Sequence, residues 1–247
     1  MSDRRDNRPL VEELPWDSTF FGFSIGRISG GRPSSAELSE AISECRSRGI
    51  RCAYLLCAAD AVESVTFAIR QGFRLVDIRV TLDSKVSAAH AGVPGTRLAT
   101  SEDLPALVGL AGPAFERSRF FVDGRFPRER VEALFARWIT RDLESADGVV
   151  AVVERDGRIA GFASALMAPD RTAQVGLVGV ASEFRGLRVG RQAVAGLMTL
   201  VAGRGVERVR VVTQGCNRGA LRLYEECGFR MSSVETWLHW WLDEDPL

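Results

Sequence analysis

The sequence VGLVGVASEFRGLRVG, residues 175–190, decides the fold of this chain. Its first six residues are apolar and rich in valine, and the run is too short for a buried helix. We therefore predict a buried strand over 175–180. A polar turn follows, and apolar residues then recur at helical spacing through 189–201, until Gly203 ends the pattern.

A second β-rich run at 209–213 precedes another helix, for which Asn217 is well placed as N-cap. This order of elements makes the turn at 185–190 the candidate functional site. A helix N-terminus presents unpaired N–H groups and the positive end of the helix dipole, so it binds phosphate readily. Gly186 and Gly190 would let a diphosphate approach the backbone closely. By itself, a turn with two glycines is more often only a tight connection.

Composition excludes several classes of function. Thirty-two basic residues balance thirty-two acidic ones among 247, so no overall charge attracts nucleic acid or an anionic membrane. The two histidines, His90 and His239, make a histidine-based metal site or a Ser-His-Asp triad improbable, and we expect no metal. An odd number of cysteines without a Cys-x-x-Cys pair predicts reduced thiols in the cytoplasm. We find no signal peptide and no apolar run that could span a bilayer. The sequence does not indicate the oligomeric state, and a homodimer is left open.

The remaining elements follow from periodicity and turn residues. Residues 14–23 are dense in aromatic side chains and predict a turn packed on the core, after a frayed segment 1–9. A small-residue linker at 84–95 predicts two domains, 1–90 and 95–247. The predicted elements are a helix over 36–48 with Ser35 as N-cap, a strand over 52–57, a helix over 62–70, a strand over 73–82, a strand over 96–99, a helix from a capping box at 100–103 through 115, a helix over 128–144, a hairpin of 149–153 and 159–167, and a last strand or strands within 230–242.

The first domain repeats part of the second. A shift of 156 residues without a gap places Arg48-Gly49 on Arg204-Gly205 and Gly72-Phe73-Arg74 on Gly228-Phe229-Arg230. The shift also places Ala61 and Ala68 opposite Asn217 and Tyr224. Because the first copy lacks these polar side chains, we interpret it as a degenerate half-domain that extends the fold.

Two motifs carry a resemblance to a known family. RGLRVG at 185–190 resembles the Arg/Gln-x-x-Gly-x-Gly/Ala signature of the GNAT acyltransferases, and NRGALRLYEECGF at 217–229 resembles a later motif of the same superfamily. Arg188 departs from the signature, which has glycine there. The resemblance implies an α+β GNAT fold, with a mixed central sheet and helices on both faces, preceded by the degenerate half-domain.

The resemblance also implies acetyl-CoA as co-substrate. It places Tyr224 beside the thioester sulfur as general acid, with Asn217 at the start of the same helix. Asn217 and Tyr224 lie about 10 Å apart on one helix face. A cysteine acyl-enzyme through Cys216 or Cys227 is the alternative, but neither has a histidine neighbour. The residues implied to hold the coenzyme are Val178, Gly179 and Val180, which bind the pantetheine arm, and Arg185, Gly186, Leu187, Arg188, Val189 and Gly190, which bind its diphosphate, together with Asn217.

The acceptor amine is expected to contact the segment between the first two helices of the second domain. Arginines alternate there with aromatic residues, which could hold a diphosphate and stack a base, although a plain connection with solvated arginines is as compatible. Together with residues 14–22 and 136–139, this segment resembles the dTDP-fucosamine acetyltransferase family, whose members acetylate the 4-amine of a dTDP-linked 4-amino-4,6-dideoxygalactose. The candidate acceptor contacts are Ser118, Arg119, Phe120 and Asp123.

Other interpretations stay open. The chain could acetylate another amine, such as an aminoglycoside, a polyamine or a protein N-terminus, or it could bind coenzyme A without turnover. The acceptor amine must lose a proton, and Glu116, Asp123 and Glu183 are candidate general bases by position only.

Overall fold

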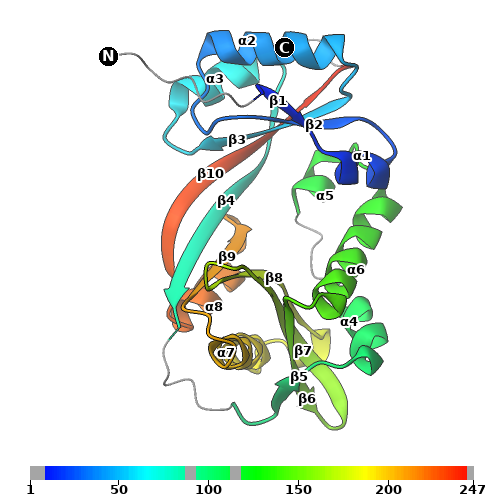
Figure 1. The fold of residues 1–247 in the computed structure, drawn as a ribbon, viewed down its shortest axis with the longest axis vertical. Helices are drawn as coiled ribbons and strands as arrows, with labels where there is room; N and C mark the ends of the chain where they lie inside the picture. Colours follow the sequence, from blue (N-terminus) through cyan, green and yellow to red (C-terminus); the bar gives the residue numbers. More distant parts are fainter. Residues whose placement is uncertain (1–8, 87–92, 112–117, 244–247) are drawn as a thin grey trace. The chain divides into compact units, whose positions relative to one another are not determined.

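The structure, a computed structural model, describes residues 9–86, 93–111 and 118–243. The chain forms two compact units (Figure 1). Unit 1 comprises Met1–Arg79, Arg119–Pro127 and Val234–Leu247, and unit 2 comprises Val80–Ser118 and Arg128–Ser233. This division differs from the boundary expected at 90–95, because two later segments of the chain pack with the first 79 residues.

Unit 1 is a sheet in the order β1-β2-β3-β10-β4 with helices packed on it. β2 and β3 are parallel, whereas β1 pairs with β2 and β10 pairs with β3 in antiparallel register. Side chains alternate between the two faces, so Leu55 and Leu238 join the core under α2, while Tyr54 and His239 face an aromatic cluster. The elements of this unit are β1 (Val11–Glu13), α1 (Pro15–Phe21), β2 (Ile25–Ile28), α2 (Ser35–Ser47), β3 (Cys52–Ala58), α3 (Val62–Arg70), α5 (Arg119–Asp123) and parts of β4 (Arg74–Lys85) and β10 (Arg230–Trp241).

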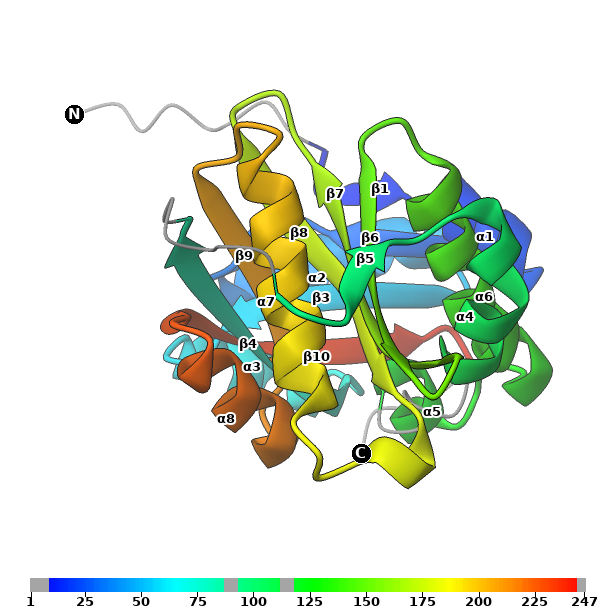
Figure 2. The same ribbon diagram turned by 90° about the horizontal axis from the view of Figure 1, so that it is seen from below.

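Unit 2 holds the rest of β4 and β10 and continues in the order β4-β9-β8-β7-β6-β5. Helix α7 packs on one face of β6, β7 and β8, and α4 and α6 pack on the other (Figure 2). The predicted α+β fold with a mixed sheet and helices on both faces is confirmed. The elements are β5 (Thr96–Leu98), η1 (Ser101–Asp103), α4 (Leu104–Ala111), α6 (Arg128–Glu144), β6 (Gly148–Arg155), β7 (Arg158–Met167), β8 (Thr172–Val180), η3 (Ser182–Phe184), α7 (Val189–Ala202), β9 (Arg208–Gln214) and α8 (Arg218–Glu226).

Local signals in the sequence placed most helix ends correctly. The bounds of α3 and α6 are those predicted, and Asn217 caps α8 by accepting the Ala220 N–H. Ser34, rather than Ser35, caps α2, because its hydroxyl accepts the Glu37 N–H in a capping box. The aromatic stretch expected to be a turn contains the helix α1, which begins with proline and ends at Gly22 with a φ of 83°. The predictions for 1–8, for 87–92 with His90, and for 112–117 lie outside the described residues.

The internal repeat extends to the structure itself. Shifted by 156 residues, the bounds of β3, α3 and β4 coincide with those of β9, α8 and β10. The residues before the two helices, Ala61 and Asn217, share their backbone conformation, with φ near −80° and ψ of 58° and 69°. The two copies therefore differ in side chains more than in backbone.

Candidate acetyl-CoA-binding and active site

The site begins where two parallel strands of unit 2 separate. The ladder between β8 and β9 joins only 172–174 to 208–210, whereas β8 continues to Val180 and β9 to Gln214. Beyond Gln174, the β8 edge that faces β9 is therefore left open, and an extended ligand can pair with it as an added strand. The parallel pair of unit 1 is different, because β2 pairs with β3 along its whole length.

A cleft of about 970 Å³ occupies this opening. Val178 and Val180 line it from β8, and Thr213 and Gln214 line it from β9. Tyr224 and Asn217 contribute from α8, as their spacing predicted. The glycine turn and the start of α7 complete the lining with Phe184, Arg185, Gly186, Arg188, Val189, Gly190 and Arg191.

Two predicted coenzyme contacts are not among the residues that line the cleft. The Leu187 side chain is exposed, and its N–H bonds the Phe184 carbonyl at 3.3 Å. Gly179 lies under the Phe162 ring, which a Cβ at this position would strike. The sequence motif is a continuous segment, so it includes residues that face the cleft and residues that face away from it. A motif alone does not separate the two kinds.

The turn before α7 explains the departure at Arg188. Its φ of 61° lies in the left-handed region that favours glycine, and Gly186 has a φ of 80°. The arginine thus adopts a backbone conformation that glycine adopts readily, at a cost of about 1 kcal/mol. The first N–H groups of α7 remain without partners within the helix. These groups, with Arg185 and Arg188, can hold a diphosphate.

Tyr224 is the polar side chain best placed for chemistry in the cleft. Its ring packs against Phe229 with 5.7 Å between ring centroids, and 5% of the residue is exposed. Burial raises the pKa of Tyr224 above its ordinary value near 10. The phenol consequently stays protonated at neutral pH and acts as a hydrogen-bond donor.

The acceptor residues predicted from sequence do not form one group. Ser118 lines the cleft, and its buried Oγ has no hydrogen-bond partner in the described structure. Phe120 and Asp123 are buried in unit 1 and do not line the cleft, and their assignment as acceptor contacts stays a prediction. Asp123 accepts hydrogen bonds from His239 Nδ1 and Trp241 Nε1, so its carboxylate is part of that core. Burial lowers the pKa of His239 to about 4, which keeps the ring neutral.

Arg119 is held differently within unit 1. Its guanidinium lies 4.3 Å from the Tyr54 ring centroid and 4.0 Å from that of Trp237. Its Nη1 is buried and has no partner among the described residues. The alternation of arginine and aromatic residues therefore produces cation–π packing here, and the Nη1 donor has no hydrogen-bond acceptor among the described residues.

Of the candidate general bases, the two that the structure describes, Asp123 and Glu183, do not line the cleft. Asp123 is buried as described, and Glu116 lies outside the described residues. Glu183 lines a neighbouring pocket, where hydrogen bonding by its own backbone amide lowers its pKa. Among the described residues that line the cleft, the acidic one is Glu226, which was not among the predicted bases. Its position two residues after Tyr224 in the same helix is the feature of the sequence that could have pointed to it.

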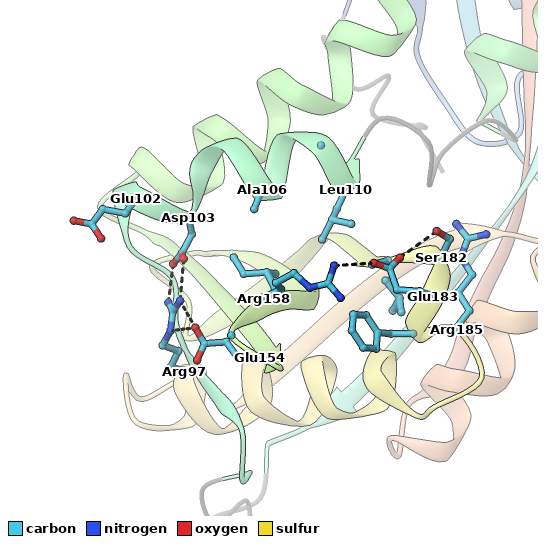
Figure 3. Close-up of a pocket in the computed structure, with 16 residues that line it drawn as sticks. Arg97, Glu102, Asp103, Ala106, Leu110, Glu154, Arg158, Ser182, Glu183 and Arg185 are labelled. Carbon is cyan, nitrogen blue, oxygen red and sulfur yellow. Dashed lines mark hydrogen bonds and ion pairs between the residues drawn. The ribbon is translucent and has the colours of Figure 1, made fainter.

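The neighbouring pocket measures about 690 Å³ and shares Val180, Phe184 and Arg185 with the cleft. Figure 3 shows Arg158 pointing toward Glu183, and Arg97 between Asp103 and Glu154. Its charged groups are thus largely paired with one another. We assign the chemistry to the cleft, because Tyr224, Asn217 and the start of α7 all line the cleft and not this pocket.

The Arg97–Asp103 pair in this pocket predicts a pH-dependent loss of stability. Arg97 donates to both carboxylate oxygens of Asp103, at 2.7 and 2.9 Å, and these bonds lower the pKa of Asp103 to about 2. The stabilisation is complete above the unfolded pKa near 3.9 and is lost as the pH falls toward 2. Since Arg97 is partly exposed, we expect Asp103→Asn to reduce the free energy of unfolding by about 1–2 kcal/mol at pH 7.

Urea unfolding at pH 7 and at pH 2.5 measures this effect. The difference in the free energy of unfolding between Asp103→Asn and the natural sequence should be smaller at pH 2.5 than at pH 7. Glu102→Gln, at the exposed neighbouring residue, should change the free energy of unfolding little at either pH. A difference that is equal at both pH values would contradict the prediction.

Other chemistries find less support in the described residues. They contain no group of three or more histidine, cysteine, aspartate or glutamate side chains arranged for a metal ion. All five cysteines are free thiols. Burial raises the pKa of Cys227 to about 11, which makes it a poor nucleophile, and Cys216 is exposed. No helix in the described part of the chain is long and apolar enough to cross a membrane.

Comparison with known proteins agrees with this geometry. Residues 113–229 match the acetyltransferase (GNAT) family. The dTDP-fucosamine acetyltransferase of Escherichia coli O6:H1 is 27% identical over 237 residues, which are 94% of this chain and 98% of that protein. The spore coat polysaccharide biosynthesis protein SpsD of Bacillus subtilis is 28% identical over 139 residues, 56% of this chain and 48% of SpsD, so the chain spans about half of that relative. The crystal structure of a GCN5-related N-acetyltransferase from Sphaerobacter thermophilus shares the fold, with a TM-score of 0.64, 15% identity, and coverage of 94% of this chain and 76% of that one.

Proposed function

Because the chain carries a GNAT acetyltransferase domain and is an acetyltransferase of that type, we propose that it moves the acetyl group of acetyl-CoA directly to the 4-amine of a dTDP-linked 4-amino-4,6-dideoxyhexose. The observation that carries the donor half of this proposal is the open edge of β8, which leads from Tyr224 to the N-terminus of α7. The donor supplies an activated thioester, and the residues of the chain bind it, orient it and stabilise charge.

The chain binds the donor with backbone more than with side chains. The edge of β8 at 178–180 pairs with the pantetheine arm as an added strand would, and its amides can polarise the thioester carbonyl. The N–H groups at the start of α7, with Arg185 and Arg188, hold the diphosphate. Asn217 shapes the wall of the cleft while its Oδ1 caps α8 at 3.1 Å from the Ala220 nitrogen.

Tyr224 acts on the sulfur that leaves. In water, proton transfer from a phenol of pKa near 10 to a thiolate of pKa near 8.5 is uphill by about 2 kcal/mol. Burial raises the pKa of Tyr224 further, but burial also destabilises a bare thiolate. The phenol therefore donates a hydrogen bond to the charge that develops on sulfur and need not transfer its proton completely.

The acceptor half of the proposal has separate support. The dTDP-fucosamine acetyltransferase matches along nearly the whole of both chains, including unit 1. SpsD is by its name a polysaccharide biosynthesis protein. Within unit 2, Ser118 Oγ is a buried polar atom without a partner in the described structure, and we propose it as a contact for the nucleotide sugar. The free cysteines agree with a cytoplasmic enzyme.

Coenzyme A release tests the proposal. Purified protein is incubated with acetyl-CoA and either dTDP-fucosamine or a panel of an aminoglycoside, a polyamine and a peptide N-terminus. We expect turnover with the sugar nucleotide alone. Turnover only with another amine would refute the sugar substrate, and binding of acetyl-CoA without turnover of any amine would show a coenzyme-binding module.

A further inference from the structure

Strand β8 contains a β-bulge beneath the cleft. Val175 pairs with Ala165 and Val178 pairs with Ala163, so Gly176 and Leu177 together oppose the single residue Ser164. Val175 and Val178 consequently face the same core against α7, although they are three residues apart. In a regular strand, residues three apart point to opposite faces.

A buried hydrogen-bonded chain closes the gap that this bulge leaves in the ladder. The Leu177 N–H donates to Ser164 Oγ at 3.0 Å, and the Ser164 hydroxyl donates to Asp142 Oδ2 at 2.6 Å. Arg141 Nη2 and Nε donate to Asp142 Oδ1 at 2.7 and 3.1 Å. Asp142 and Ser164 are both fully buried. A carboxylate in such a position is costly unless its oxygens are bonded, so the arrangement is specific.

The glycine at the bulge fits the same arrangement. A Cβ on Gly176 would collide with Asp142 Oδ2 and would lie 3.0 Å from Ser164 Oγ. The carboxylate thus occupies the space that a side chain at this position would need. Gly176, Ser164 and Asp142 form one interlocking set, contributed by β8, β7 and α6.

We propose that Asp142 and Ser164 are positioning residues for acetyl transfer, acting through the bulge of β8. A shift of one residue in a strand exchanges the faces of every later side chain and the edges of every later N–H group. The bulge therefore determines that Val178 and Val180 line the cleft and which amides face the open edge. Ser164 and Asp142 stabilise the bulge, and with it this register of β8, without contacting the donor. The proposal rests on the acetyl transfer proposed above. The two residues affect the alignment of the thioester and not the binding of the diphosphate.

Ser164→Ala and Asp142→Asn test this role. We expect each variant to lower kcat about tenfold, while the Kd for coenzyme A stays within about twofold because the turn at 185–190 is unchanged. Amide hydrogen exchange at Leu177 should become faster by at least about tenfold. Ser164→Thr, which keeps a hydroxyl, should restore most of kcat. The double variant should be no slower than the slower single variant, since both act through one bulge.

Thr140→Ala is the matched control, because Thr140 Oγ1 bonds only the Ala136 carbonyl of its own helix, at 2.8 Å. Wild-type kcat and Leu177 exchange in Ser164→Ala would overturn the proposal. Faster exchange throughout unit 2 with a parallel loss of coenzyme A binding would also overturn it, by showing general destabilisation. Should Ser164→Ala not fold, Asp142→Asn is judged by the same criteria. The exchange and binding readouts need no acceptor, so they separate failure of this proposal from failure of the proposed sugar substrate.

Discussion

Replacing Tyr224 with phenylalanine is expected to lower kcat by about 10²–10⁴-fold, the usual contribution of a positioned proton donor. The ring is retained, so its packing against Phe229 and the shape of the cleft persist. The affinity for acetyl-CoA should stay the same, because the hydroxyl contributes only when charge develops on the sulfur. Steady-state kinetics with saturating acceptor gives kcat, and calorimetric titration gives the Kd.

The chain offers a matched control for this variant. Tyr54 is the other of its two tyrosines, buried in unit 1 with a hydroxyl that has no partner among the described residues. Tyr54→Phe should leave kcat unchanged. An unchanged kcat in Tyr224→Phe would remove the phenol from the mechanism, whereas a parallel loss of acetyl-CoA affinity would make it a binding residue.

The second large effect concerns Arg185. Charge-assisted hydrogen bonds contribute about 1.5–3 kcal/mol, and the exposure of Arg185 places the expected value near the lower end. We expect Arg185→Ala to weaken coenzyme A binding about tenfold and to leave kcat at saturation unchanged. The loss should be equal for dephospho-coenzyme A, which keeps the diphosphate, and absent for pantetheine, which lacks it.

Arg158→Ala is the control for Arg185, because Arg158 lines the neighbouring pocket and not the cleft. It should bind coenzyme A as the natural sequence does. Equal coenzyme A affinity in Arg185→Ala would refute the phosphate role. A loss seen with coenzyme A but not with dephospho-coenzyme A would move Arg185 to the 3′-phosphate.

The parts of the fold that follow from local chemistry could be predicted from the sequence. The N-cap of α8 at Asn217 and the capping box of Thr100 and Asp103 are signals within four residues of one another. The repeat offset of 156 residues was visible through its glycines, because Gly72 and Gly228 both end helices with a φ of 88°. At these two positions the backbone is left-handed, and both copies have glycine there although many side chains around it differ.

What the sequence did not show depends on contacts between distant segments. The separation of β8 from β9 is a property of two strands, and neither strand encodes it alone. Asp142 lies within the helix predicted over 128–144, and nothing in that pattern shows that it is buried against Ser164, 22 residues away. Asp123 was predicted as an acceptor contact, and its hydrogen-bond partners His239 and Trp241 come from the far end of the chain. Burial of a charge becomes predictable only once its partner is known.

The central claim is that acetyl-CoA lies along the open edge of β8 with its sulfur beside Tyr224, and a crystal structure of the protein with bound acetyl-CoA tests it most directly. We predict the diphosphate at the N-terminus of α7, the pantetheine arm paired with residues 178–180, and the Tyr224 hydroxyl within hydrogen-bond distance of the sulfur. A ligand bound outside the cleft, or a Tyr224 hydroxyl that points away from the sulfur, would contradict the account.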